Sequence, residues 1–343
     1  MAVTIRDVAR AAGVSMSTVS RALSSPDQVA AETRDRVEAA ARAMSYRPNR
    51  AARGLITGRT GNLGLVVPDL ENPFFGSICK GVQARARAAG YAVFIADTDE
   101  DPTAEVEVVR SLARQVDGLI LCSSRGTDQA LERLAAECRL VLLNRRFADL
   151  PSLVFDNEGG ARAVTRHLAA LGHRRIAYAG GPTTSWSQGR RLEALQLCCD
   201  ETPGLDLVDL GHFPPVFAGG VQAADLALAS GATAVVGFND LVAVGVLDRL
   251  HQRGVAVPHD LSVAGFDDVP IAGLASPGLT TVHSPRLQMG RASVDLLLAE
   301  VLGQPVEVPA ALELATHLVV RESTGVAAGF AREPVGRPAG QSA

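Results

Sequence analysis

The chain has 343 residues, of which 47% are hydrophobic and 20% charged, and its net charge is −4. This length and composition predict a soluble globular protein of two or three domains. No apolar run reaches the roughly 18 residues of a membrane helix, and charges stand where a signal peptide needs an apolar stretch. We therefore expect a cytoplasmic, nucleoid-associated location rather than a membrane or secreted one.

The charge is distributed unevenly along the chain. Residues 1–60 contain ten arginines and five acidic residues, which gives +5, so the remainder carries −9. A basic N-terminal segment on an acidic body predicts a polyanionic partner for that segment alone.

The cysteines and histidines show no spacing typical of a metal site. The five cysteines lack a C-x-x-C pair and lie mostly in apolar runs, which predicts reduced core thiols. The seven histidines show no H-E-x-x-H or H-x-x-x-H spacing, and we interpret His173 as the end of a helix with arginines at the surface. No nucleophile-elbow, phosphate-loop or dinucleotide motif follows a predicted strand. We therefore predict no enzyme, no cofactor and no metal.

Two short amphipathic helices are predicted at the N-terminus. Thr4 and Asp7 have capping-box spacing, and an apolar stripe follows and ends at Gly13. Ser15 is the expected N-cap of the second helix. The stripe of the first helix consists of Ile5, Val8, Ala9 and Ala12. The pair matches a helix-turn-helix, although this stretch alone equally fits a helical hairpin packed on a larger body.

The second helix has a candidate reading face for DNA. Thr18, Val19 and Ala22 lie on one side at 100° per residue, and the other side carries Met16, Ser17, Ser20 and Arg21. The second helix of a helix-turn-helix enters the major groove. There an arginine can contact guanine through two hydrogen bonds, whereas methionine and serine offer an apolar contact and a permissive hydroxyl.

A third helix and a short marginal run follow. Residues 32–46 predict a helix with Val37, Ala40, Ala41 and Met44 inward and three arginines outward. Pro48 opens a run over 49–56 that is too short to be a stable isolated helix and is weakened further by Gly54. Its arginines and the single Leu55 predict a segment that orders only against phosphates and an apolar slot, such as a minor groove.

The rest of the chain alternates apolar runs with helical stretches. The runs fall into two series, at 63–68, 91–97, 117–123 and 139–144, and at 174–181, 205–211, 233–239 and 261–267. Helical patterns such as 73–90, 101–115, 127–137 and 240–254 lie between them. Near-continuous apolar strands that alternate with helices predict parallel α/β sheets, and two series predict two lobes.

Polar residues follow most of the predicted strands, where open α/β sheets bind ligands. They suit a polyol, and Phe74, Phe75 or Trp186 can stack on a sugar ring. Alternatively, about half of them only cap the next helix, as Asp240 can. These positions are Asp69, Asn72, Asp97, Thr98, Ser123, Ser124, Asn144, Arg145, 182–191, Asn239, Asp240, Asp267 and Asp268.

Residues 3–58 resemble, almost position by position, the DNA-binding head of the lactose-repressor (LacI/GalR) family of bacterial transcription regulators. The segments 65–83, 167–182, 237–245 and 262–285 resemble the periplasmic sugar-binding-protein fold that this family uses as its effector domain. The resemblance implies an all-α helix-turn-helix head with a hinge helix, followed by a two-lobed α/β body with parallel sheets.

The implied domains are a head over 1–47, a hinge helix and linker over 48–59, and an effector-binding and dimerisation body over 60–325. The N-lobe comprises 60–156 and 284–316, and the C-lobe 157–283 and 317–325. Residues 326–343 are rich in glycine, proline and alanine and predict a disordered tail without the leucine heptads of tetrameric relatives.

The resemblance also implies site residues. Those for DNA are Thr4, Ser15, Met16, Ser17, Thr18, Ser20, Arg21, Asn49, Arg50, Ala52 and Leu55, with Leu55 intercalating at the centre of the site. Those for the effector, together with the stacking candidate Trp186, are Phe74, Phe75, Ser123, Asn144, Arg145, Ser187, Arg191, Asn239 and Asp267. Two departures from the family pattern are Ala30, where a serine usually caps the third helix, and a missing aromatic near Pro214 or Pro215.

The implied function is a homodimeric transcription regulator, in this family most often a repressor. It binds a palindromic operator with a central CG, and a small-molecule effector between the lobes controls that binding. A sugar is the first expectation for the effector, with a purine, nucleoside or sugar acid as alternatives. A cytoplasmic solute-binding module and an enzyme acting on sugar or DNA are the alternatives from other classes.

Overall fold

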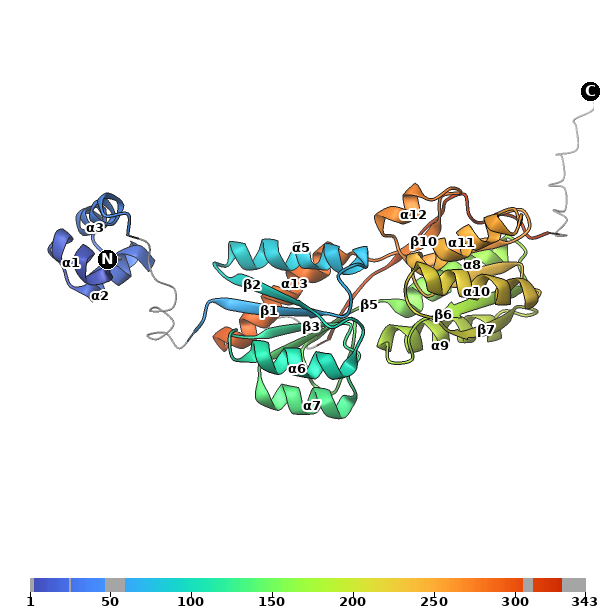
Figure 1. Cartoon of the computed structure of the whole chain (residues 1–343), viewed down its shortest axis with the longest axis horizontal. Helices are drawn as coiled ribbons and strands as arrows, with labels where there is room; N and C mark the ends of the chain where they lie inside the picture. The colour runs from blue at the N-terminus through green and yellow to red at the C-terminus, as the bar shows by residue number, and fades with distance from the viewer. Residues whose placement is uncertain (1–2, 25, 47–58, 305–310, 329–343) are drawn as a thin grey trace, which may run out of the picture. The chain divides into compact units, whose positions relative to one another are not determined.

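The computed structural model of the chain contains two compact units, Met1–Gly61 and Asn62–Ala343 (Figure 1). It describes residues 3–24, 26–46, 59–304 and 311–328. The predicted hinge run 49–56 lies outside the described residues, as does most of the predicted tail 326–343. The expectation that the tail begins at residue 326 is wrong, because Ala327 is buried and its amide donates to the Leu171 carbonyl at 2.9 Å.

The first unit is a small bundle of helices, α1 (Ile5–Ala12), α2 (Met16–Ser24) and α3 (Ala31–Ala43), with a 3₁₀ turn at Pro26–Gln28. The Asp7 carboxylate accepts hydrogen bonds from the Thr4 amide at 2.9 Å and from its hydroxyl at 2.7 Å. Gly13 ends α1 with a φ of 66°, and the Ser15 hydroxyl accepts from the Thr18 amide at 3.1 Å. Both predicted helix starts are confirmed. As expected, Ala30 gives α3 no side-chain cap.

The bundle has its own apolar core. Each helix contributes its predicted inward stripe, which buries Val8, Ala9, Ala12, Val19, Ala22, Val37 and Ala41. Burial of such small side chains supplies less free energy than a Leu-rich core, because the gain scales with the apolar area removed from water.

The second unit contains two six-stranded sheets, with strand orders β11-β5-β4-β3-β1-β2 and β12-β10-β9-β8-β6-β7. The first comprises β1 (Asn62–Val67), β2 (Ala92–Asp97), β3 (Leu119–Cys122), β4 (Leu140–Leu143), β5 (Ser152–Phe155) and β11 (Ala311–Leu314). The second comprises β6 (Arg175–Gly180), β7 (Asp206–His212), β8 (Ala234–Gly237), β9 (Ser262–Asp267), β10 (Thr280–His283) and β12 (His317–Val319). The strand pairs are parallel except β10 with β12, so the predicted parallel two-lobed α/β body is confirmed.

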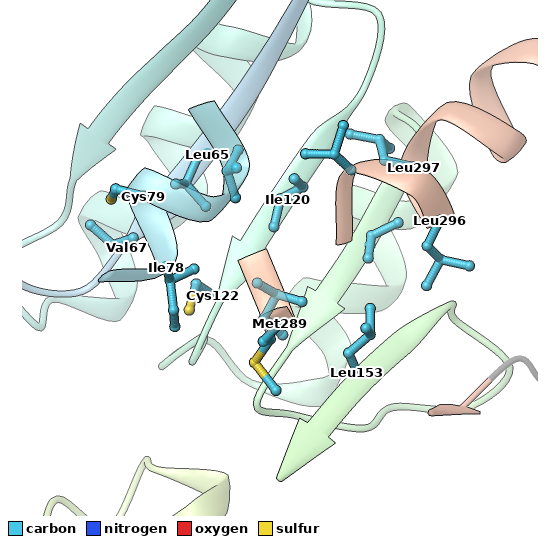
Figure 2. Packing of buried hydrophobic residues seen from close by; sticks show 14 of the residues in the cluster. Leu65, Val67, Ile78, Cys79, Ile120, Cys122, Leu153, Met289, Leu296 and Leu297 are labelled. Atoms are coloured by element: carbon cyan, nitrogen blue, oxygen red, sulfur yellow. The ribbon is translucent and has the colours of Figure 1, made fainter. Parts of the chain in front are cut away.

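Helices cover both faces of each sheet, as the continuous apolar strands require. On the first sheet, α5 (Pro73–Ala88) and α13 (Arg286–Leu302) pack on one face, and α6 (Pro102–Ala113) and α7 (Asp128–Glu137) on the other. On the second, α8 (Asn157–Ala170) and α9 (Trp186–Asp200) lie opposite α10 (Phe217–Ala229) and α11 (Asp240–Gln252). The short α12 (Pro270–Leu274) follows β9. Figure 2 shows the core between α5, α13 and the first sheet, where Ile78 and Met289 face Ile120 and Leu153.

Pairs of glycines let neighbouring helices approach closely. A Cβ on Gly81 of α5 would overlap the Leu287 carbonyl oxygen, and one on Gly290 of α13 would overlap the Ile78 carbonyl oxygen. Gly220 and Gly245 form the equivalent contact between α10 and α11. These positions require glycine for space rather than for backbone freedom.

The chain passes from one sheet to the other at the connections β5 to α8, β10 to α13 and β11 to β12. Asn157, Arg286 and Thr316 therefore lie at or beside the connections between the lobes. Any rotation of one lobe against the other has to bend the backbone there.

The cysteines are free thiols, and Cys79, Cys122, Cys198 and Cys199 are buried, as predicted. His173 is also buried, with its ring nitrogens 2.8 Å from the Thr233 hydroxyl and 3.1 Å from the Gly325 carbonyl. None of the helices in the described ranges is long and apolar enough to span a membrane.

Candidate functional site

The outward face of α2 is the candidate nucleic-acid surface. Met16 is 44% exposed, Ser17 and Arg21 are also exposed, and Ser20 is half-buried. Arg21 donates from Nε to the Ser17 carbonyl at 3.4 Å, which lays its guanidinium along the helix. The side chains of this face are therefore available to a partner, while the opposite face of α2 is occupied by the core.

The N-terminal end of α2 carries a small hydroxyl network. The Ser15 hydroxyl lies 2.8 Å from those of Ser17 and Thr18. Ser15 and Thr18 thus order the start of the reading helix, and Thr4 does the same for α1. The remaining predicted DNA contacts, Asn49, Arg50, Ala52 and Leu55, lie outside the described residues.

A cavity lies in the second unit, lined by residues that follow the strands of both sheets. We call it the inner cavity. It is lined by Asn72, Phe74, Phe75, Glu100, Ser123, Arg125, Asn144, Ser185, Ser187, Arg191, Pro215, Phe238, Asn239 and Asp267. Eight of the ten predicted effector residues are in this set. It lies where a parallel α/β fold places its ligands, at the carboxyl ends of the strands.

The first sheet contributes two strained residues to this cavity. Ser123 and Asn144 follow β3 and β4 and have φ values of 50° and 55°. The Asn144 amide donates to the Ser123 hydroxyl at 3.1 Å, but its carbonyl oxygen Oδ1 is buried without a partner. Such strain and an unpaired buried acceptor are destabilising, and both concentrate at binding sites.

Arg125 and Glu100 form a charge pair at the edge of the inner cavity. Two guanidinium nitrogens of Arg125 contact the two Glu100 carboxylate oxygens at 2.5 and 2.9 Å, and a third donates to the Ser123 carbonyl at 2.7 Å. Buried Glu105 accepts from the backbone amides of Arg125 and Gly126 at 2.8 and 3.1 Å, which holds this loop in place. The positive charge of Arg125 is therefore already balanced.

Arg191 and Asp267 form the second charge pair, with Nη2 of Arg191 3.2 Å from Oδ1 of Asp267. Arg191 also donates to Oδ1 of Asn157 at 3.0 Å and to the Phe238 carbonyl. Its guanidinium lies 4.4 Å from the centre of the Phe266 ring. Burial raises the pKa of Asp267, and the nearby arginines oppose that rise.

The loop that carries Asp267 is held by Asp240, which is fully buried. Oδ1 of Asp240 accepts from the Thr281 hydroxyl, and Oδ2 accepts from the Val269 amide at 2.8 Å. Burial and the neighbouring Asp267 charge raise the pKa of Asp240 well above its ordinary value. The expectation that Asp240 caps a helix is wrong. Asn239 is the cap, because its Oδ1 accepts from the Val242 amide at 2.9 Å.

Arg145 and Trp186 are predicted effector residues that the structure does not bring into the inner cavity. Arg145 donates to the Ser124 and Gly126 carbonyls at 3.1 and 2.6 Å and pairs with Asp128 at 2.7 Å, so it supports the loop from behind. Trp186 lines a separate cavity, and the Arg190 guanidinium lies 5.9 Å from its ring centre. Arg145 follows β4, whereas Trp186 is the first residue of α9, and the packing sets the direction of each side chain.

Several lining residues were not predicted. Glu100 and Arg125 lie farther along the chain than the polar positions predicted after their strands. Phe238 lies inside an apolar run, which predicts a core residue. Pro215 belongs to the stretch that departs from the family pattern. Asn72 and Ser185 were among the polar positions that the sequence indicated after strands but not among the ten predicted effector residues, and each caps the helix that follows.

Comparison with known proteins supports both units. Residues 4–49 match the family model for bacterial regulatory proteins of the lacI family, and residues 165–324 match a periplasmic binding protein-like domain. The ribose operon repressor of Halalkalibacterium halodurans is 33% identical over 94% of this chain and 97% of its own length. The transcriptional repressor CytR of Escherichia coli K12 is 34% identical over 94% of this chain and 96% of its own length.

Solved structures agree over nearly the whole chain. The lac repressor dimer bound to operator and the anti-inducer ONPF has a TM-score of 0.82 at 31% identity, covering 95% of this chain and 100% of that one. The complex of the regulator CelR with cellobiose has a TM-score of 0.70 at 31% identity, covering 94% and 99%. With a helix-turn-helix head, two parallel α/β sheets and near full-length relatives, this chain belongs to the lacI family of bacterial regulatory proteins.

Proposed function

We propose that this protein is a homodimeric transcription repressor that binds a palindromic operator through α2 of each protomer. An effector bound in the inner cavity either weakens or strengthens this operator binding. The observation that carries the proposal is that residues of both sheets line one cavity in a chain whose other unit presents an exposed helix-turn-helix face. The mechanism has no chemical step, and it operates in the cytoplasm, where the operator is.

The domain boundaries that we propose are 1–47 for the head, 48–59 for the hinge and linker, 60–328 for the body and 329–343 for the tail. The N-lobe comprises 60–156 and 284–316, and the C-lobe 157–283 and 317–328. The membership of the two sheets supports this division, because β11 joins the first sheet and β12 the second.

For DNA recognition we propose Met16, Ser17 and Arg21 as base contacts, with Ser20 beside them on the same face. Thr4, Ser15 and Thr18 start their helices and are suited to phosphate contacts. The arrangement of the lac repressor dimer on its operator supports a pair of heads on two half-sites. Asn49, Arg50, Ala52 and Leu55 complete the proposed set, with Leu55 at the central CG.

For the effector we propose a sugar held in the inner cavity. Phe74, Phe75 and Phe238 supply apolar surface, and the unpaired Asn144 Oδ1 and Ser187 Oγ call for hydroxyl partners. The names of the relatives, a ribose operon repressor and a regulator in complex with cellobiose, support the same class. Ser123, Arg191, Asn239 and Asp267 complete the proposed effector contacts.

Hydrogen bonds join residues of the inner cavity to the segments where the chain crosses from one lobe to the other. Arg191 donates to Asn157 at the β5 to α8 connection, and Asn157 in turn donates to the Phe155 carbonyl at 3.0 Å. Arg286, at the β10 to α13 connection, donates to the Asp268 carbonyl at 2.8 Å. A ligand that contacts Arg191 and Asp267 therefore acts beside the bending points, and about 1 to 3 kcal/mol of coupling per site suffices for a regulatory switch.

The test has a DNA part and an effector part. Selection of the full chain on random DNA should enrich a palindrome with a central CG, and a gel shift on that site should weaken or strengthen with an effector. Effectors are found by thermal shift against a sugar and nucleoside panel, since a ligand at 100 times its Kd adds about 2.7 kcal/mol. Absence of any shift at low salt would refute the DNA function.

A further inference from the structure

The inner cavity adjoins a second, larger cavity that has one acidic wall. We call it the acidic mouth. The two cavities share Glu100 and Pro215. The acidic mouth is lined by Asp69, Glu71, Asp97, Asp99 and Glu100 on one side and by Pro182, Thr184, Pro214, Pro215 and Val216 on the other.

The backbone fixes the carboxylates of the acidic mouth in place. Asp97 accepts from the Leu70 amide at 2.7 Å and from the Asp99 amide at 2.9 Å. Asp69 accepts from the Glu71 amide at 2.7 Å. Burial raises the pKa of Asp69, and the nearby Asp97 and Glu100 raise it further, so these carboxylates lie within one another's field.

The negative charge of the acidic mouth is not balanced. Glu100 is paired with Arg125, but within the described part of the chain no basic side chain lies within ion-pair distance of Asp69, Glu71, Asp97 or Asp99. The inner cavity contains the paired Arg191 and Asp267 and is neutral. A ligand that enters by the acidic mouth therefore passes four uncompensated carboxylates before it reaches a neutral interior.

Unpaired polar groups inside the inner cavity show, independently, what the ligand must offer. Asn144 is 6% exposed and Ser187 2% exposed, and Asn144 Oδ1 and Ser187 Oγ lack a hydrogen-bond partner. The Ser187 hydroxyl can donate or accept, whereas Asn144 Oδ1 accepts only and requires an O–H or N–H donor from the ligand. Hydroxyl and amine groups satisfy it.

We infer that the effector is an uncharged or amine-bearing polyhydroxylated molecule reaching from the inner cavity toward the acidic mouth, and that the mouth selects against sugar acids and sugar phosphates. This inference rests on the proposed effector function and narrows its ligand class. The sugar acid, one of the alternatives that the sequence leaves open, is thereby set aside.

The experiment compares ligands that share a sugar or nucleoside and differ in one charged substituent. Thermal shift and calorimetry on the full chain use glucose, glucosamine, glucuronate and glucose 6-phosphate, with ribose and ribose 5-phosphate, galactose and galacturonate, and adenosine and adenosine monophosphate as further sets. In each set that binds, the neutral or amine member should bind at least tenfold more tightly than its acid or phosphate at low salt. Added salt should reduce this difference in affinity, because it screens the carboxylates.

The variant Glu71→Gln/Asp99→Asn tests whether the acidic mouth is the cause. It should lower the ratio of the acid's Kd to the neutral ligand's Kd by about fivefold. Each carboxylate about 8 Å from the ligand's negative charge weakens binding of the acid about two- to threefold in water, and the variant removes two of them. Glu132→Gln/Asp149→Asn removes the same charge from two exposed acids outside both cavities and should leave the ratio unchanged.

Three results would overturn the inference: an acid or phosphate that binds as tightly as its neutral partner, no binding by any panel member, or an equal effect of both double variants. In each case the gel shift on the selected operator tells the two proposals apart. If the gel shift is retained, the proposed regulatory function is still supported and only the proposed ligand class is refuted.

Discussion

Arg191→Ala should destabilise the second unit by about 3 to 5 kcal/mol. The side chain is 3% exposed and donates to Asn157, Phe238 and Asp267. Its removal leaves a buried carboxylate unpaired, and breaking a buried ion pair from one side costs about that much. The orphaned Asn157 and Phe238 oxygens add less than their full desolvation penalty, because the space left by the side chain joins the inner cavity and admits water.

The assay is urea unfolding of the full chain followed by tryptophan fluorescence. The chain contains one tryptophan, and Trp186 lies on the same helix as Arg191, so the signal reports the second unit alone. Arg190→Ala is the matched control. Its guanidinium is exposed and paired with Glu193, and its loss should change the stability by no more than about 0.5 kcal/mol.

A double-mutant cycle identifies the origin of the loss. Arg191→Met with Asp267→Asn replaces both charges, and the pair should cost at least about 1 kcal/mol less than the two single changes added together. Strict additivity, or a loss below about 1 kcal/mol for Arg191→Ala, would show that the pair is solvated and that the reasoning is wrong.

The remaining predictions concern other parts of the chain. Because burial raises the folded-state pKa of Asp240, its contribution to stability is fully present below pH 3.8 and is lost as the pH rises above that value through the folded pKa, so the melting temperature of Asp240→Asn relative to wild type should increase as the pH rises above 3.8; a difference independent of pH would contradict the shift. Arg21→Ala should weaken operator binding by about 1 to 3 kcal/mol and relax the base preference at one position of the site. Arg36→Ala should weaken binding to operator and to random DNA equally. If Arg21→Ala also weakens binding to random DNA by as much as to operator, Arg21 contacts only phosphate. Gly290→Val should destabilise the second unit by about 1 to 3 kcal/mol, because its side chain would overlap the Ile78 carbonyl oxygen; an unchanged urea midpoint would refute the close contact.

Local patterns predicted most of the fold. Runs such as 139–144 and 261–267 are buried on both faces and appeared as strands because a continuous apolar run has few other uses in a soluble chain. β5, β10, β11 and β12 were not predicted, because polar residues such as Ser152, Thr280, Glu313 and His317 leave them no long apolar run. They are nevertheless the strands that adjoin the lobe connections.

The candidate site was predicted in its position and only partly in its members. Ser123, Asn144 and Asp267 follow strands, so their presence at the inner cavity could be expected. Arg125 and Arg145 both lie on the same edge of the sheet, and only the packing decides that Arg125 lines the cavity while Arg145 supports the loop from behind.

The sequence by itself determined the classes of structure: a helix-turn-helix head with its reading face, a parallel two-lobed body, and strand ends rich in hydroxyl-binding groups. These follow from the periods of short segments. The tertiary structure alone decided the charge balance of the inner cavity and the imbalance of the acidic mouth. Ion pairs such as Arg191 with Asp267 join residues far apart in the chain, and the local sequence carries no signal for which charges meet and which remain unpaired.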